Sequence, residues 1–347
     1  MKIKLLTLLL FAGNILSAQI TLIPDSIFEQ KLIDLNYDIF HDGWVITDSI
    51  NSIDSLDISS FNGQTDKITD LTGIEGFTNL QYLNCSNNKF DTLNLNNNQY
   101  LKHIICASDS IEVLMTDSLF SLDKLQCNSN NITELNLLGN PSLTELGCWD
   151  NQLDNLNLSN NIYLGYLNCG ENNITSLDVS MLDLYDLRCQ NNAISTINLD
   201  NNYSLEWLSC YNNNLQNINL TVNTNLIVLN VGNVSSQPSI YSNDLNSLDL
   251  SNNCNITTFY SKGNANLECI QVCDISAANN WNTQNIDTQH FFSIDCNYTA
   301  INEGSERNQK IISIKDIYGR ESGIHTNSFL FYIYQNGSVK KQIILDN

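Results

Sequence analysis

Positively charged residues and prolines are scarce in this chain of 347 residues. Lysine and arginine number 15 against 37 aspartates and glutamates, which gives a formal net charge of −22 at pH 7. Such an acidic surface repels the phosphates of nucleic acids and anionic membranes, so neither is an expected partner. Only three prolines accompany the many asparagines, a composition that suits a stacked β-rich coil better than a helical protein.

The motifs that mark common catalytic and cofactor sites are missing as well. The sequence has no CxxC pair that would indicate zinc, and no nucleophile elbow, HExxH or phosphate-binding loop. After residues 1–18 no stretch is apolar enough to cross a bilayer. The histidines are far apart in sequence: His41, His103, His290 and His325. We therefore predict a protein that is neither an enzyme nor an integral membrane protein and that has no cofactor or metal; an unrecognised hydrolase is the alternative.

The chain consists largely of one repeated sequence. Its clearest copies are LQYLNCSNN from Leu80, LDKLQCNSN from Leu122, LTELGCWDN from Leu143, LGYLNCGEN from Leu164 and LEWLSCYNN from Leu205. A cysteine recurs at a spacing of 21 residues, once 20: Cys85, Cys106, Cys127, Cys148, Cys169, Cys189 and Cys210. A fixed period of this length predicts a solenoid, in which each turn stacks only on its neighbours.

Each repeat has a second half with similar alternation. Examples are FDTLNLNNN from Phe90, ITELNLLGN from Ile132, LDNLNLSNN from Leu153 and ISTINLDNN from Ile194. Apolar residues at every second position predict two short strand-like segments in each turn. The asparagine-rich corners suit a chain that bends sharply, because asparagine tolerates left-handed backbone and bonds its own main chain.

This unit resembles a leucine-rich repeat, in the nested bacterial variant called the IRREKO type, and we assign the solenoid to residues 53–268. The resemblance implies the fold class: a β-rich leucine-rich-repeat solenoid with a parallel sheet along one face, a short N-terminal helical cap and a small C-terminal β domain. It also implies an inward ladder of asparagines that bond the backbone of adjacent turns: Asn88, Asn130, Asn151, Asn172, Asn192 and Asn213. Asp109 should weaken this ladder, since an ionised carboxylate cannot donate. Val234 should end it, where the insertion VSSQPSIYS interrupts the array.

Residues 1–18 have the features of a secretory signal. Lys2 and Lys4 precede a short apolar run, and we predict cleavage between Ala18 and Gln19. A membrane anchor is the alternative, although the run is short for a span.

Residues 19–52 should form the N-terminal cap. The segment Ile23–Asn36 has apolar residues at helical spacing and has Pro24 at its beginning, so it predicts a helix over the open end of the first turn. The following segment indicates either a calcium loop or a solvated acidic turn, from Asp38, Asp42, Gly43 and Asp48. We favour the acidic turn because the spacing does not match an EF-hand.

The seven repeated cysteines stand where the consensus has an inward leucine, so we interpret them as small buried apolar residues. A metal array or a disulfide ladder is the alternative, but thiols stacked about 4.8 Å apart lack the crossed approach of a disulfide. Four later cysteines leave the register: Cys254, Cys269, Cys273 and Cys296. Residues 269–301 resemble the closing cap of the same bacterial group, which implies a Cys269–Cys296 disulfide and, secondarily, Cys254–Cys273. Sequence alone allows three connectivities.

Residues 302–347 alternate apolar and polar positions, and Asn336-Gly337 predicts a tight hairpin. The segment resembles the type A C-terminal sorting domain of type IX secretion substrates from Bacteroidota. The likeness is carried by Asp316, Gly319, Arg320, Gly337 and Lys340, among others. It implies export through the periplasm and across the outer membrane by the type IX machinery, to a secreted or surface location. An ordinary β-hairpin extension is the alternative.

On a strand of pattern L-x-x-L-x-C, the residues between the inward positions face solvent on one side of the sheet. In repeats four to seven these positions hold aromatic and charged residues: Glu145, Trp149, Tyr166, Asp186, Arg188, Trp207 and Tyr211. Exposed aromatics beside arginine are typical of binding hot spots, so we predict that this face binds a protein or glycan ligand. Alternatively the aromatics are present because they favour strands, in a structural surface protein without a specific ligand.

Overall fold

The computed structural model describes residues 19–61, 63, 65–233, 242–296, 311–321, 328–334 and 339–344. The predicted signal up to Ala18, most of the insertion after Asn233 and Gly337 lie outside the described residues. The chain divides into two compact units, Met1–Cys296 and Asn297–Asn347. Each unit is described by itself.

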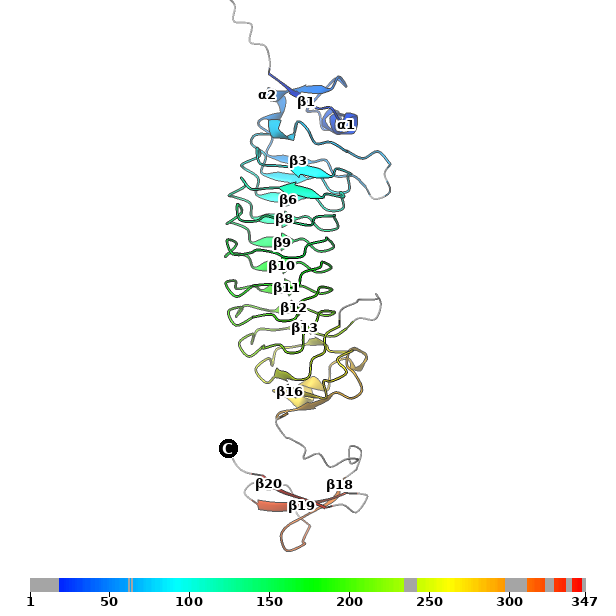
Figure 1. Ribbon diagram of the computed structural model, residues 1–347, viewed down its shortest axis with the longest axis vertical. Coiled ribbons are helices and arrows are strands. Elements are labelled where there is room, and N and C mark those ends of the chain that lie inside the picture. The colour runs from blue at the N-terminus through cyan, green and yellow to red at the C-terminus, as the bar shows by residue number, and fades with distance from the viewer. Residues whose placement is uncertain are drawn as a thin grey trace, which may run out of the picture. The chain divides into compact units, whose positions relative to one another are not determined.

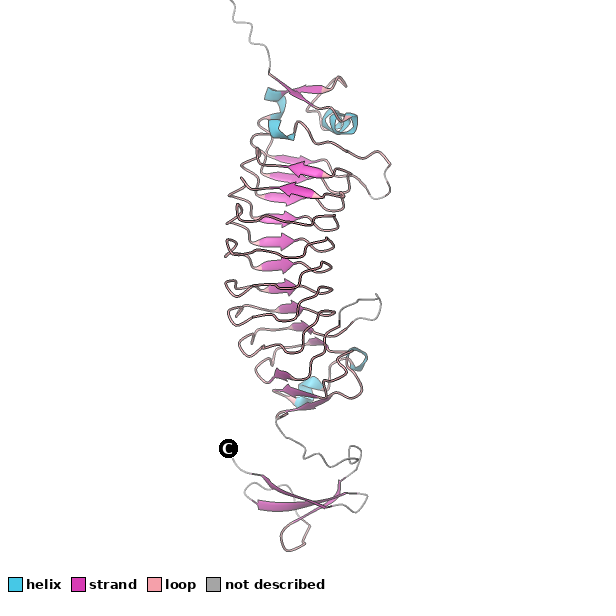
Figure 2. Ribbon diagram, in the orientation of Figure 1, coloured by secondary structure: helices cyan, strands magenta, loops and turns pink. Residues whose placement is uncertain are grey.

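The larger unit is a solenoid built on one sheet of ten parallel strands, stacked in chain order along the ribbon (Figure 1). Each turn contributes one strand to this sheet, and in most turns loops form the remainder (Figure 2). This architecture confirms the predicted leucine-rich-repeat fold class. The strands are β3 (Ser55–Asp57), β4 (Tyr82–Asn84), β6 (His103–Ile105), β8 (Lys124–Gln126), β9 (Glu145–Gly147), β10 (Tyr166–Asn168), β11 (Asp186–Arg188), β12 (Trp207–Ser209), β13 (Val228–Asn230) and β15 (Thr258–Tyr260).

The core consists of apolar side chains, mostly leucine and cysteine, stacked in register from turn to turn. Leu125, Leu146 and Leu167 are partners in successive strands and all are buried; full burial of one leucine stabilises the fold by about 1.5–3 kcal/mol. The seven repeated cysteines form a parallel column of free, buried thiols. Burial raises the pKa of Cys127 to about 12, so this thiol stays neutral and packs as an apolar side chain.

The six predicted ladder asparagines each donate to backbone carbonyls both in their own turn and in the preceding turn. For example, Asn172 Nδ2 donates to Cys148 O (3.0 Å) and Cys169 O (3.2 Å), while its Oδ1 accepts from the Leu153 N–H (3.0 Å). The buried backbone groups at the corner of each turn lie outside the strands, so strand pairing does not provide them with hydrogen bonds. The asparagine side chains provide these bonds instead.

The prediction that the ladder ends at Val234 is wrong. Asn243 takes the next position and donates to Cys210 O (2.9 Å) and Val231 O (3.1 Å). Asn264 then continues with Val231 O and Ser261 O. The insertion is accommodated between two rungs, because the buried carbonyls of the neighbouring turns still require donors.

The second half of most turns is not a strand, contrary to the sequence prediction. Within the described residues, strands there are the pair β5 (Thr92–Asn94) and β7 (Val113–Met115), and β14 (Leu248–Leu250), which pairs with β16 (Cys269–Val272) at the start of the C-terminal cap. The polar side chain of this half accepts from the backbone two residues later whether or not a strand is present: Asn157 Oδ1 accepts from the Ser159 N–H (3.1 Å), and Asn94 Oδ1 in β5 accepts from the Asn96 N–H (3.1 Å).

The N-terminal cap contains a shorter helix than predicted. α1 (Ser26–Asp34) begins after Asp25, whose carboxylate accepts from the Ile27 and Phe28 N–H groups; Pro24 precedes this N-cap. β1 (Ile20–Leu22) pairs antiparallel with β2 (Trp44–Ile46), followed by α2 (Thr47–Ile50) and η1 (Ile74–Gly76). The ring of Phe28 lies 6.4 Å from that of Phe77, so the helix closes the first turn with apolar contacts.

The C-terminal cap is a second parallel sheet in which β16 (Cys269–Val272) lies between β14 and β17 (Phe291–Ser293), with α3 (Ile275–Ala278) and η2 (Thr283–Asn285) between the last two strands in sequence. Disulfides join Cys254 to Cys273 and Cys269 to Cys296, the two pairings that the resemblance implied. The Trp281 ring packs 4.6 Å from Phe259 and 5.3 Å from Phe292, between centroids. These aromatics cover the last turn of the core.

The smaller unit is an antiparallel sheet of β18 (Ile311–Lys315), β19 (Ser328–Tyr334) and β20 (Val339–Ile344). After β18 the chain turns at Asp316, which accepts from the Tyr318 and Arg320 N–H groups and from Arg320 Nε (2.7 Å). Gly319 has φ +77° there, and Lys340 belongs to β20. Nowhere in the described parts of either unit is there a helix with the length and hydrophobicity needed to cross a bilayer.

Asp109 is the one carboxylate in the asparagine ladder. Its Oδ1 accepts from the Asn88 N–H (2.5 Å), but its Oδ2 is buried without a hydrogen-bond partner. Burial raises the pKa of Asp109 from 3.8 to about 7, against the opposing effects of that bond and of Lys67. The buried thiols of Cys85 and Cys106 are the other titratable groups that interact with it.

Stability should therefore fall as the pH rises from about 4 to about 7 and then level off, because folding takes up a proton at Asp109 in this window. The slope that this carboxyl contributes is at most about 1.4 kcal/mol per pH unit. Asp109→Asn restores an amide that donates, so it should remove this slope and stabilise the protein at pH 8. Urea unfolding of both proteins at pH 5 and pH 8 measures the difference. An unchanged pH slope in the variant would contradict the assignment.

Candidate functional site

The solvent-facing side chains of the ten-stranded sheet form columns, because the strands are paired in exact register. The first column contains Glu145, Tyr166, Asp186 and Trp207 at successive turns, and the second contains Arg188 between Asn168 and Ser209. Neighbours in one column are about 4.8 Å apart at the backbone. Aromatic, acidic and basic side chains of adjacent turns are therefore brought into contact.

Arg188 is the centre of this cluster. Its guanidinium donates to both Asp186 oxygens, at 3.0 Å from Nε and 2.8 Å from the terminal nitrogen. The same group lies 4.7 Å from the Trp207 ring centroid and 5.8 Å from that of Tyr166. A cation held over two aromatic rings and fixed by a bidentate carboxylate has little remaining conformational freedom.

The burial and the charge of these side chains also indicate that the cluster is rigid. Asp186 is buried, Arg188 and Tyr166 are half-buried, and Trp207 is 38% exposed. The hydrogen bonds that Arg188 donates to Asp186 are the main cause that raises the pKa of Arg188, so the guanidinium remains charged. The cluster is a rigid platform whose most exposed member is an indole ring.

The other predicted site residues lie outside this cluster. Glu145 pairs with Lys124 (2.6 Å), which the sequence prediction did not include. Trp149 and Tyr211 share a third column, separated by Gly170 and Gln190, and in the described solenoid neither has a ring contact with the cluster. Burial and Glu171 raise the pKa of Tyr211.

Sequence reasoning missed Tyr185, because it considered only positions within the strands. Tyr185 directly precedes β11 and is nearly half exposed. A Cβ on Gly165 would lie 2.8 Å from Tyr185 Cε1, so the phenol ring lies over this glycine beside the cluster. The sequence did contain a signal for Tyr185. Gly165 in the preceding turn has no side chain, so the large ring of Tyr185 can lie against its backbone.

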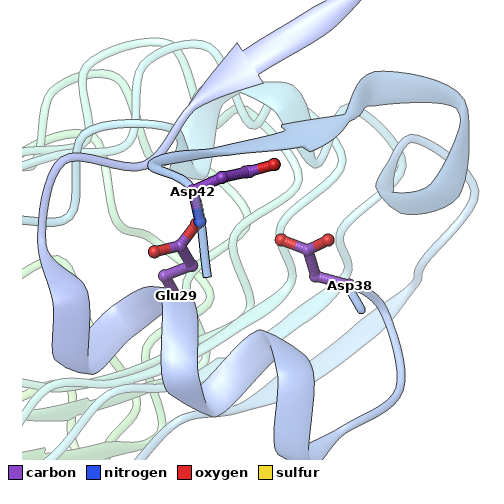
Figure 3. A group of neighbouring side chains, drawn as sticks. All are labelled: Glu29, Asp38 and Asp42. Atoms are coloured by element: carbon purple, nitrogen blue, oxygen red, sulfur yellow. The ribbon is translucent and has the colours of Figure 1, made fainter. Parts of the chain in front are cut away.

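Three carboxylates gather in the N-terminal cap, where the loop after α1 returns over the helix (Figure 3). Glu29, Asp38 and Asp42 could place one ligand atom each within 4.8 Å of one another, whereas the acidic turn considered from sequence used Asp48 and not Glu29. Glu29 is 3% exposed. It accepts from the Asp42 N–H (2.8 Å) and Gly43 N–H (2.5 Å) and lies 3.1 Å from His41 Nε2. This carboxylate therefore fastens the loop to the helix.

A serine, a histidine and an aspartate also meet in the C-terminal cap. His290 Nδ1 lies 3.1 Å from Ser261 Oγ, and His290 Nε2 lies 3.6 Å from Asp287 Oδ2. A catalytic serine must reach a substrate carbonyl, but Ser261 is fully buried. Burial also lowers the pKa of His290. We interpret the three residues as a fastening of the cap.

We expect the Asp186–Arg188 pair to be coupled in stability. Arg188→Met leaves a buried carboxylate without its partner and should cost about 1–3 kcal/mol. Asp186→Asn combined with Arg188→Met should recover part of this loss, since the charge is gone. A double-mutant cycle by urea unfolding measures the coupling. Additive effects of the two single changes would show that the pair does not act as a unit.

No protein-family model matches the chain, and no curated protein does. Among solved structures it is similar to the functional domain of InlJ from Listeria monocytogenes, described as including a cysteine ladder, with 26% identity and a TM-score of 0.58. The match covers 79% of this chain and 61% of that one. The chain thus spans about three fifths of the length of this relative.

Two other structures have the same fold at lower identity. A leucine-rich-repeat protein of Leptospira interrogans is 20% identical, with a TM-score of 0.56 and coverage of 71% of this chain and 62% of that one. Internalin C2 of Listeria monocytogenes is 24% identical, with a TM-score of 0.53 and coverage of 60% and 96%. Together with the stacked leucine, cysteine and asparagine columns, these likenesses identify the fold as a bacterial-type leucine-rich-repeat solenoid.

Proposed function

We propose that this chain is an exported binding protein whose ligand is another protein, recognised through the sheet face of the solenoid. The observation that carries the proposal is the preorganised cluster of Tyr166, Asp186, Arg188 and Trp207 on consecutive strands. Arginine and aromatic side chains dominate binding hot spots. Because packing already fixes these side chains, little of their entropy remains to be lost on binding.

A protein ligand fits this face better than a glycan. Sugar rings bind by stacking on a free aromatic face, but the Arg188 guanidinium lies over the Trp207 ring at 4.7 Å. The ring edge and the guanidinium together suit a contact with peptide groups and side chains. A purely structural role would leave the exposed indole without a partner.

Export is the second part of the proposal. Two disulfides close the C-terminal cap, and disulfides persist in oxidising compartments. The signal-like residues 1–18 with cleavage after Ala18, and the sheet of the smaller unit with its turn at Asp316 and Arg320, support a route through the periplasm and the type IX machinery. The mature protein would then be secreted or held at the outer surface.

Binding can be tested by site-specific photo-crosslinking of the full chain. A benzophenone amino acid in place of Val228, which pairs with Trp207 in the neighbouring strand, should give discrete adducts with a surface-protein extract, whereas one in place of exposed Asn155, outside the sheet, should not. For the partner so identified, Trp207→Ala should raise Kd at least tenfold, because the indole is the exposed centre of the cluster. Equal adducts at both positions, or an unchanged Kd, would reject this face as the binding surface.

Export can be tested with a fluorescent cargo that carries residues 1–18 at its start and residues 302–347 at its end. In a Bacteroidota host with a working type IX system, we expect the cargo outside the outer membrane, measured by fractionation. Without the tail it should stay in the periplasm. A tailless cargo that reaches the surface equally well would exclude a sorting role for the smaller unit.

A further inference from the structure

A ridge of exposed apolar side chains lies at the corner that leads into the strands of the sheet. Its members occupy the turns before β8, β10, β11 and β12 and are between 52% and 73% exposed: Phe120, Ile162, Tyr163, Met181 and Tyr203. Phe120, Ile162 and Tyr203 stand at equivalent positions, two residues before the inward leucine of their repeats. Exposed Pro141 fills the same position in the turn between the first two.

The ridge is continuous over three consecutive turns, from Ile162 and Tyr163 through Met181 to Tyr203. Consecutive turns are hydrogen-bonded at this corner, as where Asn201 Nδ2 donates to Ser180 O (2.6 Å), so these side chains are close neighbours. Isolated exposed apolar residues are normal on protein surfaces, whereas a contiguous patch is typical of an interaction surface. Nothing in the folding of the turns requires large apolar residues here, since equivalent positions also hold Gln99 and Thr224.

Tyr185 connects this ridge to the sheet cluster. Its ring lies over Gly165, which directly precedes β10, and the residue itself directly precedes β11. The apolar surface therefore extends from the corner across Tyr185 to Trp207 and Tyr166. The surface available to a partner is a band that crosses the edge of the sheet, larger than the cluster alone.

The charges around this band are nearly all negative. Between His103 and Tyr260 the chain has 16 aspartates and glutamates but only two cations, Lys124 and Arg188. Both cations are already paired within the sheet, with Glu145 and Asp186 respectively. Exposed Asp183 and Glu206 flank the band, so its rim offers negative charge and no unengaged cation.

We infer that the partner docks on this band through a protein surface with an apolar centre and a lysine- or arginine-rich rim. The inference rests on the proposed protein-binding function and adds to it the ridge and the charge of the partner. Complementary charge speeds association and excludes acidic competitors. A second copy of this chain is disfavoured as occupant, because it would bring the same negative rim against its own.

A phage-displayed library of random 12-residue peptides, selected on the full protein, tests the composition of the partner. Selected peptides should be enriched in lysine or arginine together with aromatic or aliphatic residues. The best peptide, synthesised, should bind at least fivefold more weakly in 500 mM than in 50 mM NaCl, since exposed charges are screened. Recovery of acidic peptides, or of no binding peptide at all, would overturn the inference.

Variants locate the contact. Tyr163→Ser with Tyr203→Ser should weaken binding of this peptide at least tenfold, and Asp183→Asn with Glu206→Gln at least threefold. The matched controls are Phe40→Ser, an exposed aromatic residue of the N-terminal cap, and Glu112→Gln in the second half of its turn. Both controls should leave Kd unchanged. Because all these side chains are exposed, unfolding curves should coincide with that of the parent protein.

The outcomes separate this inference from the proposed function. If Trp207→Ala weakens binding but the ridge variant does not, the sheet face binds and the ridge is not part of the site. If neither change matters, both proposals fail. Binding of the protein to phosphatidylcholine vesicles that the ridge variant abolishes would assign the ridge to lipid and overturn the protein partner.

Discussion

Hydrogen bonding of each backbone turn to the next is the constraint on which this solenoid depends. The Cys148 N–H donates to Asn168 O and the Cys169 N–H to Arg188 O, both at 2.8 Å, and the same pairing recurs along the sheet. Each strand residue thereby lies about 4.8 Å from its equivalent in the adjacent strands. Inward side chains must fit both neighbours at once. A column of leucines, a column of small thiols and a column of amides that donate in two directions satisfy this requirement.

Two departures from the repeat show how strict the requirement is. Asp109 replaces an amide, keeps the bond to the Asn88 N–H, and leaves one oxygen buried without a partner; its pKa rises to about 7 because the charged form is poorly solvated. The insertion after Asn233 breaks the period in sequence, yet Asn243 returns to the ladder and bonds the same carbonyls. The buried carbonyls of the turns on either side of the insertion therefore keep their donors.

The same stacking builds the candidate binding surface. A position that faces solvent in one turn must face solvent in the next, so Arg188 contacts both Tyr166 and Trp207, although about 20 residues separate it from each of them. The rigid core beneath them keeps the guanidinium between the two rings. The corner ridge is produced by the same periodicity at another position of the turn. Strong negative charge around both features limits which partners can approach.

The sequence alone determined the period, the inward columns and the solvent-facing positions. These follow from the alternation of apolar and polar residues and from the regular spacing of the cysteines. It also placed Arg188 beside aromatic residues. Only the tertiary structure decided which side chains touch: Arg188 binds Asp186, Glu145 turns to Lys124, and Trp149 and Tyr211 stay apart from the cluster. It also decided that Asn243 resumes the ladder, that most second halves are not strands, and that Glu29 joins Asp38 and Asp42. These outcomes depend on contacts between adjacent turns and on which hydrogen-bond donors and acceptors meet in the folded chain. The order of residues along one turn determines neither of them.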